Sequence, residues 1–232
     1  MKKYILLENE TTTVNGSTLY RIIAIKDFGG VKIGEKGGWI EKEENLSHEG
    51  DCWVDDKAMV YGDAMVYDNA KVFGDTWIYG NAKVYDDADV FGNARIYCNA
   101  KVYDDAGVYG NARIYGNAKV YDDAGVYGNA RIYGNAKVYN NAMVYGDAIV
   151  CGNAMVKSIS DYIVFKNSWS SGRYFTWTKS NNKWKDGFFY GTGEELIEKA
   201  CQESELSGRM YEAYVNHVKN LMKIMENVEQ EQ

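Results

Sequence analysis

The sequence predicts a mainly β protein: a parallel β-helix of about six triangular coils, each 18 residues long, with a cap at either end. Three observations predict it. An aliphatic residue stands at every sixth position from Val54 to Val156 without exception. A small residue, nearly always alanine, stands two positions before each of them. The block 94–111 recurs as 112–129 with one exchange, glycine for Cys98.

Each six-residue unit specifies one strand and one corner of a coil. In a strand, residues two apart point to the same side, so the alanine and the aliphatic residue face inward. The variable residue and the tyrosine of each unit then face outward. We expect a strand of about four residues and a two-residue corner of Gly-Asn or Asp-Asp, since these residues accept a left-handed backbone. A helix is excluded because a period of six does not match 3.6 residues per turn.

Residues 1–51 precede the repeat and are predicted to cap its first coil as a β-hairpin. The stretches 4–9 and 18–26 have the composition of strands, and Asn15-Gly16 between them is typical of a tight hairpin turn. The end of a β-helix exposes apolar core and open strand edges. A cap is therefore required there.

The β-helix is predicted to span 52–157, and 158–232 to form a small α+β unit of three short strands and two helices. The stretches 161–166, 174–178 and 184–190 are expected as the strands. Thr192-Gly-Glu-Glu195 has the spacing of a capping box and should open the first helix. The second helix, from about 206 to 228, has apolar residues alternately three and four apart. That face suits packing on the small sheet or a coiled coil.

Composition and charge exclude several classes of protein. The net charge is −7 with no block of basic residues, which argues against nucleic acid and anionic membranes as partners. No apolar run reaches the roughly 18 residues of a membrane span, and the N-terminus lacks a signal-peptide core. Cys52, Cys98, Cys151 and Cys201 lie far apart without CxxC spacing. We therefore expect free thiols and a cytoplasmic location.

The outward-facing residues differ among the three faces of the predicted triangle. The first, the Arg/Tyr face, carries Arg95, Arg113 and Arg131 beside Tyr97, Tyr115 and Tyr133. The second, the Lys/Tyr face, carries Lys83, Lys101, Lys119 and Lys137 beside Tyr85, Tyr103, Tyr121 and Tyr139. The third, the Gly/Tyr face, carries Gly107 and Gly125 beside Tyr109, Tyr127 and Tyr145.

Each face has a functional and a structural interpretation. The Arg/Tyr face could hold the phosphates and stack the base of a small anionic, nucleotide-like ligand, or its tyrosines could merely stabilise neighbouring strands. The Gly/Tyr face leaves its rings exposed and is the candidate contact between subunits. The Asp-Asp corners at 86–87, 104–105 and 122–123 could attract calcium, but we interpret them as turns whose charge the adjoining lysines offset.

The chain also resembles a known family. The motifs Leu19-Tyr-Arg-Ile22, Gly37-Gly-Trp-Ile-Glu41 and Gly50-Asp-Cys-Trp-Val54, followed by the Tyr-Gly-Asn-Ala array, are similar to hexapeptide-repeat proteins of bacteria, phages and prophages, often labelled as transferases. The resemblance implies a left-handed β-helix and a homo-oligomer, with a trimer favoured. It assigns no catalytic residue to this chain.

Members of that family are often acyltransferases, which use a histidine base, and others resemble carbonic anhydrases, which need three histidines for a metal. This chain has two, His48 before the first full coil and His217 in the C-terminal helix. The anhydrase is therefore excluded, and no metal or cofactor is expected. His48 is the candidate base if the protein is an acyltransferase.

Our first hypothesis is a non-catalytic binding or scaffold protein of phage or prophage origin. It would bind a host protein or a small anionic ligand in a counter-defence role. An acyltransferase and a pure oligomerisation module are the alternatives.

Overall fold

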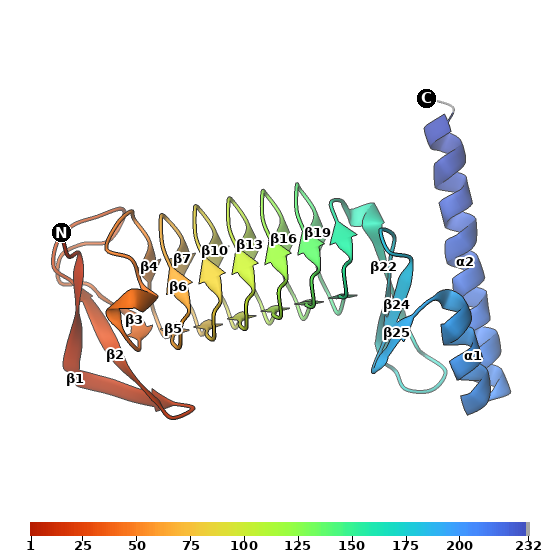
Figure 1. The fold of residues 1–232 in the computed structure, drawn as a ribbon, viewed down its shortest axis with the longest axis horizontal. Coiled ribbons are helices and arrows are strands. Elements are labelled where there is room, and N and C mark those ends of the chain that lie inside the picture. The colour runs from red at the N-terminus through yellow and green to blue at the C-terminus, as the bar shows by residue number, and fades with distance from the viewer. Residues whose placement is uncertain (231–232) are drawn as a thin grey trace. The chain divides into compact units, whose positions relative to one another are not determined.

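The structure is a computed structural model that describes residues 1–230. It divides into two compact units, Met1–Asp161 and a second that begins at Tyr162. In the first unit, short strands recur along the chain from β4 to β21 and stack in parallel at intervals of 18 residues (Figure 1). The predicted parallel β-solenoid is confirmed.

The solenoid strands form three parallel sheets, one for each face. The Arg/Tyr face holds β5 (Met59–Val60), β8 (Trp77–Ile78), β11 (Arg95–Ile96), β14 (Arg113–Ile114), β17 (Arg131–Ile132) and β20 (Ile149–Val150). The Lys/Tyr face holds β6 (Met65–Val66), β9 (Lys83–Val84), β12 (Lys101–Val102), β15 (Lys119–Val120), β18 (Lys137–Val138) and β21 (Met155–Val156). The Gly/Tyr face holds β4 (Trp53–Val54), β7 (Lys71–Val72), β10 (Asp89–Val90), β13 (Gly107–Val108), β16 (Gly125–Val126) and β19 (Met143–Val144).

Every strand is two residues long, where about four were predicted. The tyrosine and the alanine on either side of each corner are the first and fourth residues of a turn: the Ala118 amide lies 3.4 Å from the Tyr115 carbonyl. They therefore close the corner instead of extending the strand. The coils remain tightly bonded, because the amides of Arg113, Tyr115 and Asn117 donate to carbonyls one coil further on, at 2.9, 3.0 and 2.7 Å.

The corners adopt the left-handed backbone that the sequence predicts. Gly116 has a φ of +71°, and Asp122 takes +55° at the equivalent place in the next corner. Inside the coils, Ala112, Ile114 and their counterparts are fully buried and form one continuous core. The alternation of inward and outward residues is therefore as predicted.

The N-terminal cap is the predicted hairpin with a third strand added. β1 (Tyr4–Val14) and β2 (Ser17–Ala24) pair antiparallel around Asn15 and Gly16, whose φ values are 51° and 87°. β3 (Lys36–Ile40) pairs antiparallel with β2 and parallel with β5. The sheet that contains β5 therefore gains a seventh layer, and the solenoid has about seven turns on that side. The 3₁₀ turn η1 (Glu43–Asn45) follows.

The second unit is an antiparallel sheet covered by two helices. A 3₁₀ turn, η2 (Ile159–Asp161), precedes it. Its strands are β22 (Tyr162–Lys166), β23 (Tyr174–Thr178), β24 (Lys183–Asp186) and β25 (Phe189–Gly191). Four strands replace the three predicted, because the stretch 184–190 turns at Gly187, where φ is +51°, and pairs with itself.

The helices of this unit are α1 (Gly193–Glu203) and α2 (Glu205–Gln230). The predicted capping box is present: Thr192 Oγ1 accepts from the Glu195 amide at 3.2 Å, and the Glu195 carboxylate accepts from the Thr192 amide. Between Gly193 and Gln230, neither helix combines the length and apolar character needed to cross a membrane.

Candidate ligand-binding faces of the solenoid

The arginines of the Arg/Tyr face form a column along the solenoid. Arg95, Arg113 and Arg131 occupy the same register position on adjacent strands, so they repeat about every 4.8 Å. All three are exposed, and the Arg95 guanidinium lies over the Trp77 ring at 5.0 Å from its centroid. Within residues 1–230, no carboxylate forms an ion pair with any of them.

The tyrosines beside the arginines stack on one another. Ring centroids are 5.0 Å apart between Tyr79 and Tyr97, 4.9 Å between Tyr97 and Tyr115, and 4.7 Å between Tyr115 and Tyr133. The rings are within 8° of parallel. The faces of Tyr97 and Tyr115 are thus covered by neighbouring rings, as the structural interpretation of the ladder requires. A ligand cannot stack on these covered ring faces, so the guanidinium groups are the main groups left to contact it, beside the edges of the rings.

The phenols of this column stay neutral at physiological pH. Burial raises the pKa of Tyr97 and Tyr115, and the neighbouring guanidinium groups oppose that rise only in part. Burial, together with Cys151, raises the pKa of Tyr133 further. The tyrosines therefore add no negative charge that could neutralise the arginines.

The corners beside the arginine column are also neutral. Asn81, Asn99, Asn117 and Asn135 form a ladder in which each side-chain amide donates to the next at 3.1 Å. This ladder lies in the corner that follows the arginine strands, and the corner before them contributes Gly110-Asn111 and its counterparts. The corners that directly flank the three arginines therefore contain no acidic residue, and the nearest ones in the same ladder, Asp75 and Asp147, lie one coil before and one coil beyond the column, where Asp147 accepts from Asn129 at 3.2 Å.

The lysine column differs because an aspartate ladder follows it. Asp86, Asp104 and Asp122 adopt φ values of 55–56°, and their carboxylates accept the amide of the residue one coil on, at 3.4, 3.3 and 2.9 Å. These contacts are the ones expected of aspartates that form the corners of the coils. The aspartates also place negative charge next to the lysine strands. Because the three Asp-Asp corners carry six aspartates against four lysines, the Lys/Tyr face is not cationic, whereas the Arg/Tyr face is.

The Gly/Tyr face is aromatic along its whole length. Its rings stack from Phe73 through Phe91, Tyr109 and Tyr127 to Tyr145, with centroids 4.8–5.2 Å apart. Gly125 is buried under the next coil, because a Cβ there would lie 2.6 Å from the Met143 sulfur. Subunit contact through this face stays a prediction.

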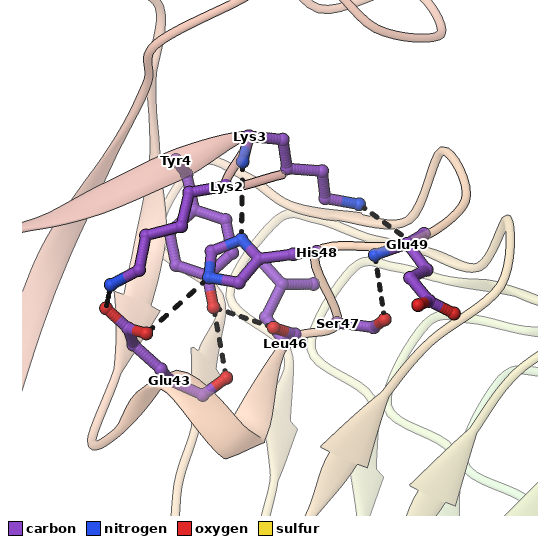
Figure 2. Close-up of polar contacts among 8 residues, drawn as sticks. All are labelled: Lys2, Lys3, Tyr4, Glu43, Leu46, Ser47, His48 and Glu49. Carbon is purple, nitrogen blue, oxygen red and sulfur yellow. Dashed lines mark hydrogen bonds and ion pairs between the residues drawn. The ribbon is translucent and has the colours of Figure 1, made fainter.

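His48 lies in the loop between η1 and β4, against the start of the chain (Figure 2). Its Nδ1 accepts from the Lys3 amide at 3.4 Å, and its ring centroid is 4.3 Å from that of Tyr4. Its Nε2 is buried and 3.6 Å from the Glu43 carboxylate, beyond hydrogen-bond distance. Burial lowers the pKa of His48 against the opposing effect of Glu43.

This geometry limits what His48 can do as a base. A neutral imidazole whose Nδ1 accepts a hydrogen bond carries its proton on Nε2, so neither nitrogen is free to accept another. A pocket of about 350 Å³, lined by His48, Met65 and Tyr67, adjoins it. His217 is exposed on α2 and does not lie with His48 in one unit.

The sequence did not reveal a larger hollow beside the first coils of the Gly/Tyr face. It measures about 680 Å³ and lies between the loop at 29–35 and the strands β4, β7 and β10. Trp53 and Phe73 contribute aromatic walls, and Lys71 is the one basic residue in the lining. Its acidic residues are Glu35, Asp51, Asp55, Asp56, Asp87 and Asp89. The hollow therefore repels anions, unlike the Arg/Tyr face.

Comparisons with known proteins find similarity within the solenoid. Residues 112–128 and 136–152 match a family model described as the YdcK beta solenoid repeat. The chain is 41% identical over 70 residues to a protein of Escherichia coli (strain K12) named "Uncharacterized acetyltransferase YdcK". That match covers 27% of this chain and 22% of that protein, so the chain matches about a fifth of the relative's length. These similarities support a β-solenoid repeat family, and the residues matched by the family model contain no histidine.

Proposed function

We propose that the protein is a non-catalytic binding protein, a solenoid whose Arg/Tyr face binds a small ligand with several anionic groups. The observation that carries the proposal is the column of Arg95, Arg113 and Arg131, which is exposed and has no carboxylate partner within residues 1–230. The Lys/Tyr face of the same solenoid has aspartates beside it, so uncompensated charge is not a general property of the repeat.

The electrostatics of the column favour an anionic ligand. Two like charges 4.8 Å apart repel by about 1 kcal/mol in water, and by more near a protein surface. Each anionic group bound between two guanidinium groups replaces that repulsion with attraction. Arginine also offers paired N–H donors that fit phosphate oxygens. A ligand with phosphates in a row, such as a nucleotide, suits this arrangement.

Such a protein would suit a counter-defence role in a phage or prophage, in which a host nucleotide signal is held away from its receptor. Its flat binding face and its histidine-free coils suit binding better than catalysis. The residues that bind would be Arg95, Arg113 and Arg131, with the hydroxyl groups of Tyr97, Tyr115 and Tyr133 as neutral donors.

Calorimetry with inorganic tripolyphosphate and with ATP tests the proposal. The double variant Arg113→Gln with Arg131→Gln should raise the Kd for both about tenfold or more, because charge-assisted hydrogen bonds are lost. The matched control is Lys101→Gln with Lys119→Gln, which removes the same charge from the Lys/Tyr face. If the two variants lose affinity equally, or if neither probe binds the unaltered protein, the proposal is wrong.

Acetyl transfer is a second candidate, favoured by the printed name of the E. coli relative. Its base would be His48, which lines the pocket with Tyr67 and would have to release its contact with the Lys3 amide. Calorimetry with acetyl-CoA at millimolar concentration tests it. Absence of binding would exclude this activity, and turnover that survives His48→Gln would exclude this residue as the base.

A further inference from the structure

The second unit contains a pocket of its own, separate from His48 and from the Arg/Tyr face. It measures about 280 Å³ and lies between the loop at 167–173, the turn that joins β24 to β25, and α1. Helix α1 packs against both of these strands (Figure 1). The volume is near the lower end of the range for ligand pockets, which is about 300–1,000 Å³. A ligand that fills this pocket must therefore be small.

A buried hydrogen-bond network forms one wall of the pocket. Tyr211 is 4% exposed and Asn167 is 3% exposed. The Asn167 side-chain amide donates to the Tyr211 hydroxyl at 3.0 Å, and that hydroxyl donates to the Asp186 carboxylate. The Asn167 side-chain oxygen accepts from the amide and from the hydroxyl of Ser170, both at 3.0 Å. The network joins α2, β24 and the loop, so the Asp186 carboxylate is held in position at the pocket.

Two cations and two anions line the same pocket. The cations are Arg173 and Lys199, and the anions are Asp186 and Glu203. In the part of the chain that the structure describes, no ion pair joins any of these four side chains to one another or to another residue. The lining is therefore neutral overall, but its opposite charges stay apart around the pocket.

The two cations lie beside the turn between β24 and β25. A Cβ built at Gly187 would lie 3.0 Å from Nη1 of Arg173, which places the guanidinium group at the turn. The Lys199 ammonium, from α1, is 5.6 Å from the centroid of the Phe189 ring. Asp186 directly precedes Gly187 in the chain, yet its carboxylate pairs with neither cation. The opposite charges thus share one small pocket without touching, which leaves room for the groups of a ligand between them.

We propose that this pocket binds a small zwitterion, a free amino acid. A simple anion would be repelled by the two carboxylates, and a simple cation by the two basic side chains. A molecule with one carboxylate and one ammonium group satisfies both. The Arg173 guanidinium offers paired N–H donors to the carboxylate, and the Asp186 carboxylate accepts from the ammonium group. The site lies within the second unit, so it is independent of any ligand on the Arg/Tyr face.

Ligand-observed NMR with the full chain and mixtures of the standard amino acids at millimolar concentration tests the proposal. At least one amino acid should bind. Calorimetry then compares it with the corresponding 2-hydroxy acid, which lacks the ammonium group, and with its carboxamide, which lacks the carboxylate. Each should bind about tenfold more weakly or worse, because charge-assisted hydrogen bonds are lost. If no amino acid binds, or if either analogue binds as tightly as the amino acid, the proposal is wrong.

Two substitutions test which side chains contact the ligand. Arg173→Gln should raise the Kd of the amino acid about tenfold but leave that of its carboxamide unchanged, because the carboxamide has no carboxylate for the guanidinium to bind. Asp186→Asn should likewise weaken the amino acid but not the 2-hydroxy acid, and asparagine can still accept from Tyr211. The matched control is Lys223→Gln, on exposed α2 outside the pocket, which should change no Kd. If Arg173→Gln weakens the amino acid and its carboxamide equally, the assignment of the carboxylate to Arg173 is overturned.

Discussion

Glycine-to-alanine substitution should have opposite effects at two positions only nine residues apart. Gly116 forms a corner with a φ of +71°, which costs a residue with a Cβ about 1–2 kcal/mol. A Cβ there would also lie 3.0 Å from the Gly134 amide nitrogen and 3.1 Å from its carbonyl oxygen, both backbone atoms. We expect Gly116→Ala to lower the free energy of unfolding by about 2 kcal/mol or more.

Gly107 provides the matched control in the same coil region. It lies in strand β13, and the nearest atom to a Cβ built there is a Tyr109 ring carbon at 3.9 Å, an ordinary contact. Since alanine restricts the unfolded chain more than glycine does, Gly107→Ala should be neutral or stabilise by up to about 1 kcal/mol. Urea unfolding followed by circular dichroism measures both variants. If Gly116→Ala unfolds at the same urea concentration as Gly107→Ala, the account of the corner is wrong.

Three further predictions test other parts of the chain. If the Gly/Tyr face joins subunits, as in the oligomerisation alternative, Gly107→Lys with Gly125→Lys should give monomers in light scattering, and an unchanged mass would exclude that face. Burial raises the pKa of Tyr85 and Tyr103 to about 12. Since these folded-state pKa values exceed the ordinary value near 10, the stability that the two neutral phenols contribute is present below about pH 10 and is lost as the pH rises through 12. Absorbance at 295 nm should therefore show that both tyrosines ionise only above pH 10. Full ionisation by pH 10.5 in the folded protein would contradict this prediction. Thr192→Ala should destabilise the second unit by about 1 kcal/mol, because the Glu195 amide loses its acceptor, whereas Thr192→Ser should not.

The repeat determined most of what the sequence could predict about the solenoid. Because Ile114 and Ala112 must face inward and Arg113 and Tyr115 outward, the period alone assigned the core, the faces and the register. The hairpin at Asn15-Gly16 and the capping box at Thr192 were predictable because each is a local pattern. The residues within the motif themselves adopt the turn or make the hydrogen bonds of the cap, without help from distant parts of the chain.

Features that depend on distant parts of the chain were not predictable in this way. The turn at Gly187 divides a stretch that the sequence predicts as one strand into β24 and β25, which pair with each other. The large acidic hollow forms only when the loop at 29–35 lies against coils that follow it in sequence. The surroundings of the His48 ring likewise depend on Lys3 and Tyr4, which contact it from more than forty residues away in the sequence.

The identical register of successive coils has a consequence for insertions and deletions. Removing residues 112–129 would join Asn111 to Ala130, and every arginine, lysine and tyrosine below the junction would meet its own kind again. Removing six residues, for example 112–117, would preserve the inward alanine and aliphatic column and would still place tyrosine on tyrosine, but at the junction it would place Arg95 against Lys119 and Arg131 against Gly107. The core therefore tolerates changes of chain length in steps of six, whereas the outer faces tolerate only steps of eighteen. Any lineage that varies the length of this solenoid while preserving a functional face should do so by whole coils.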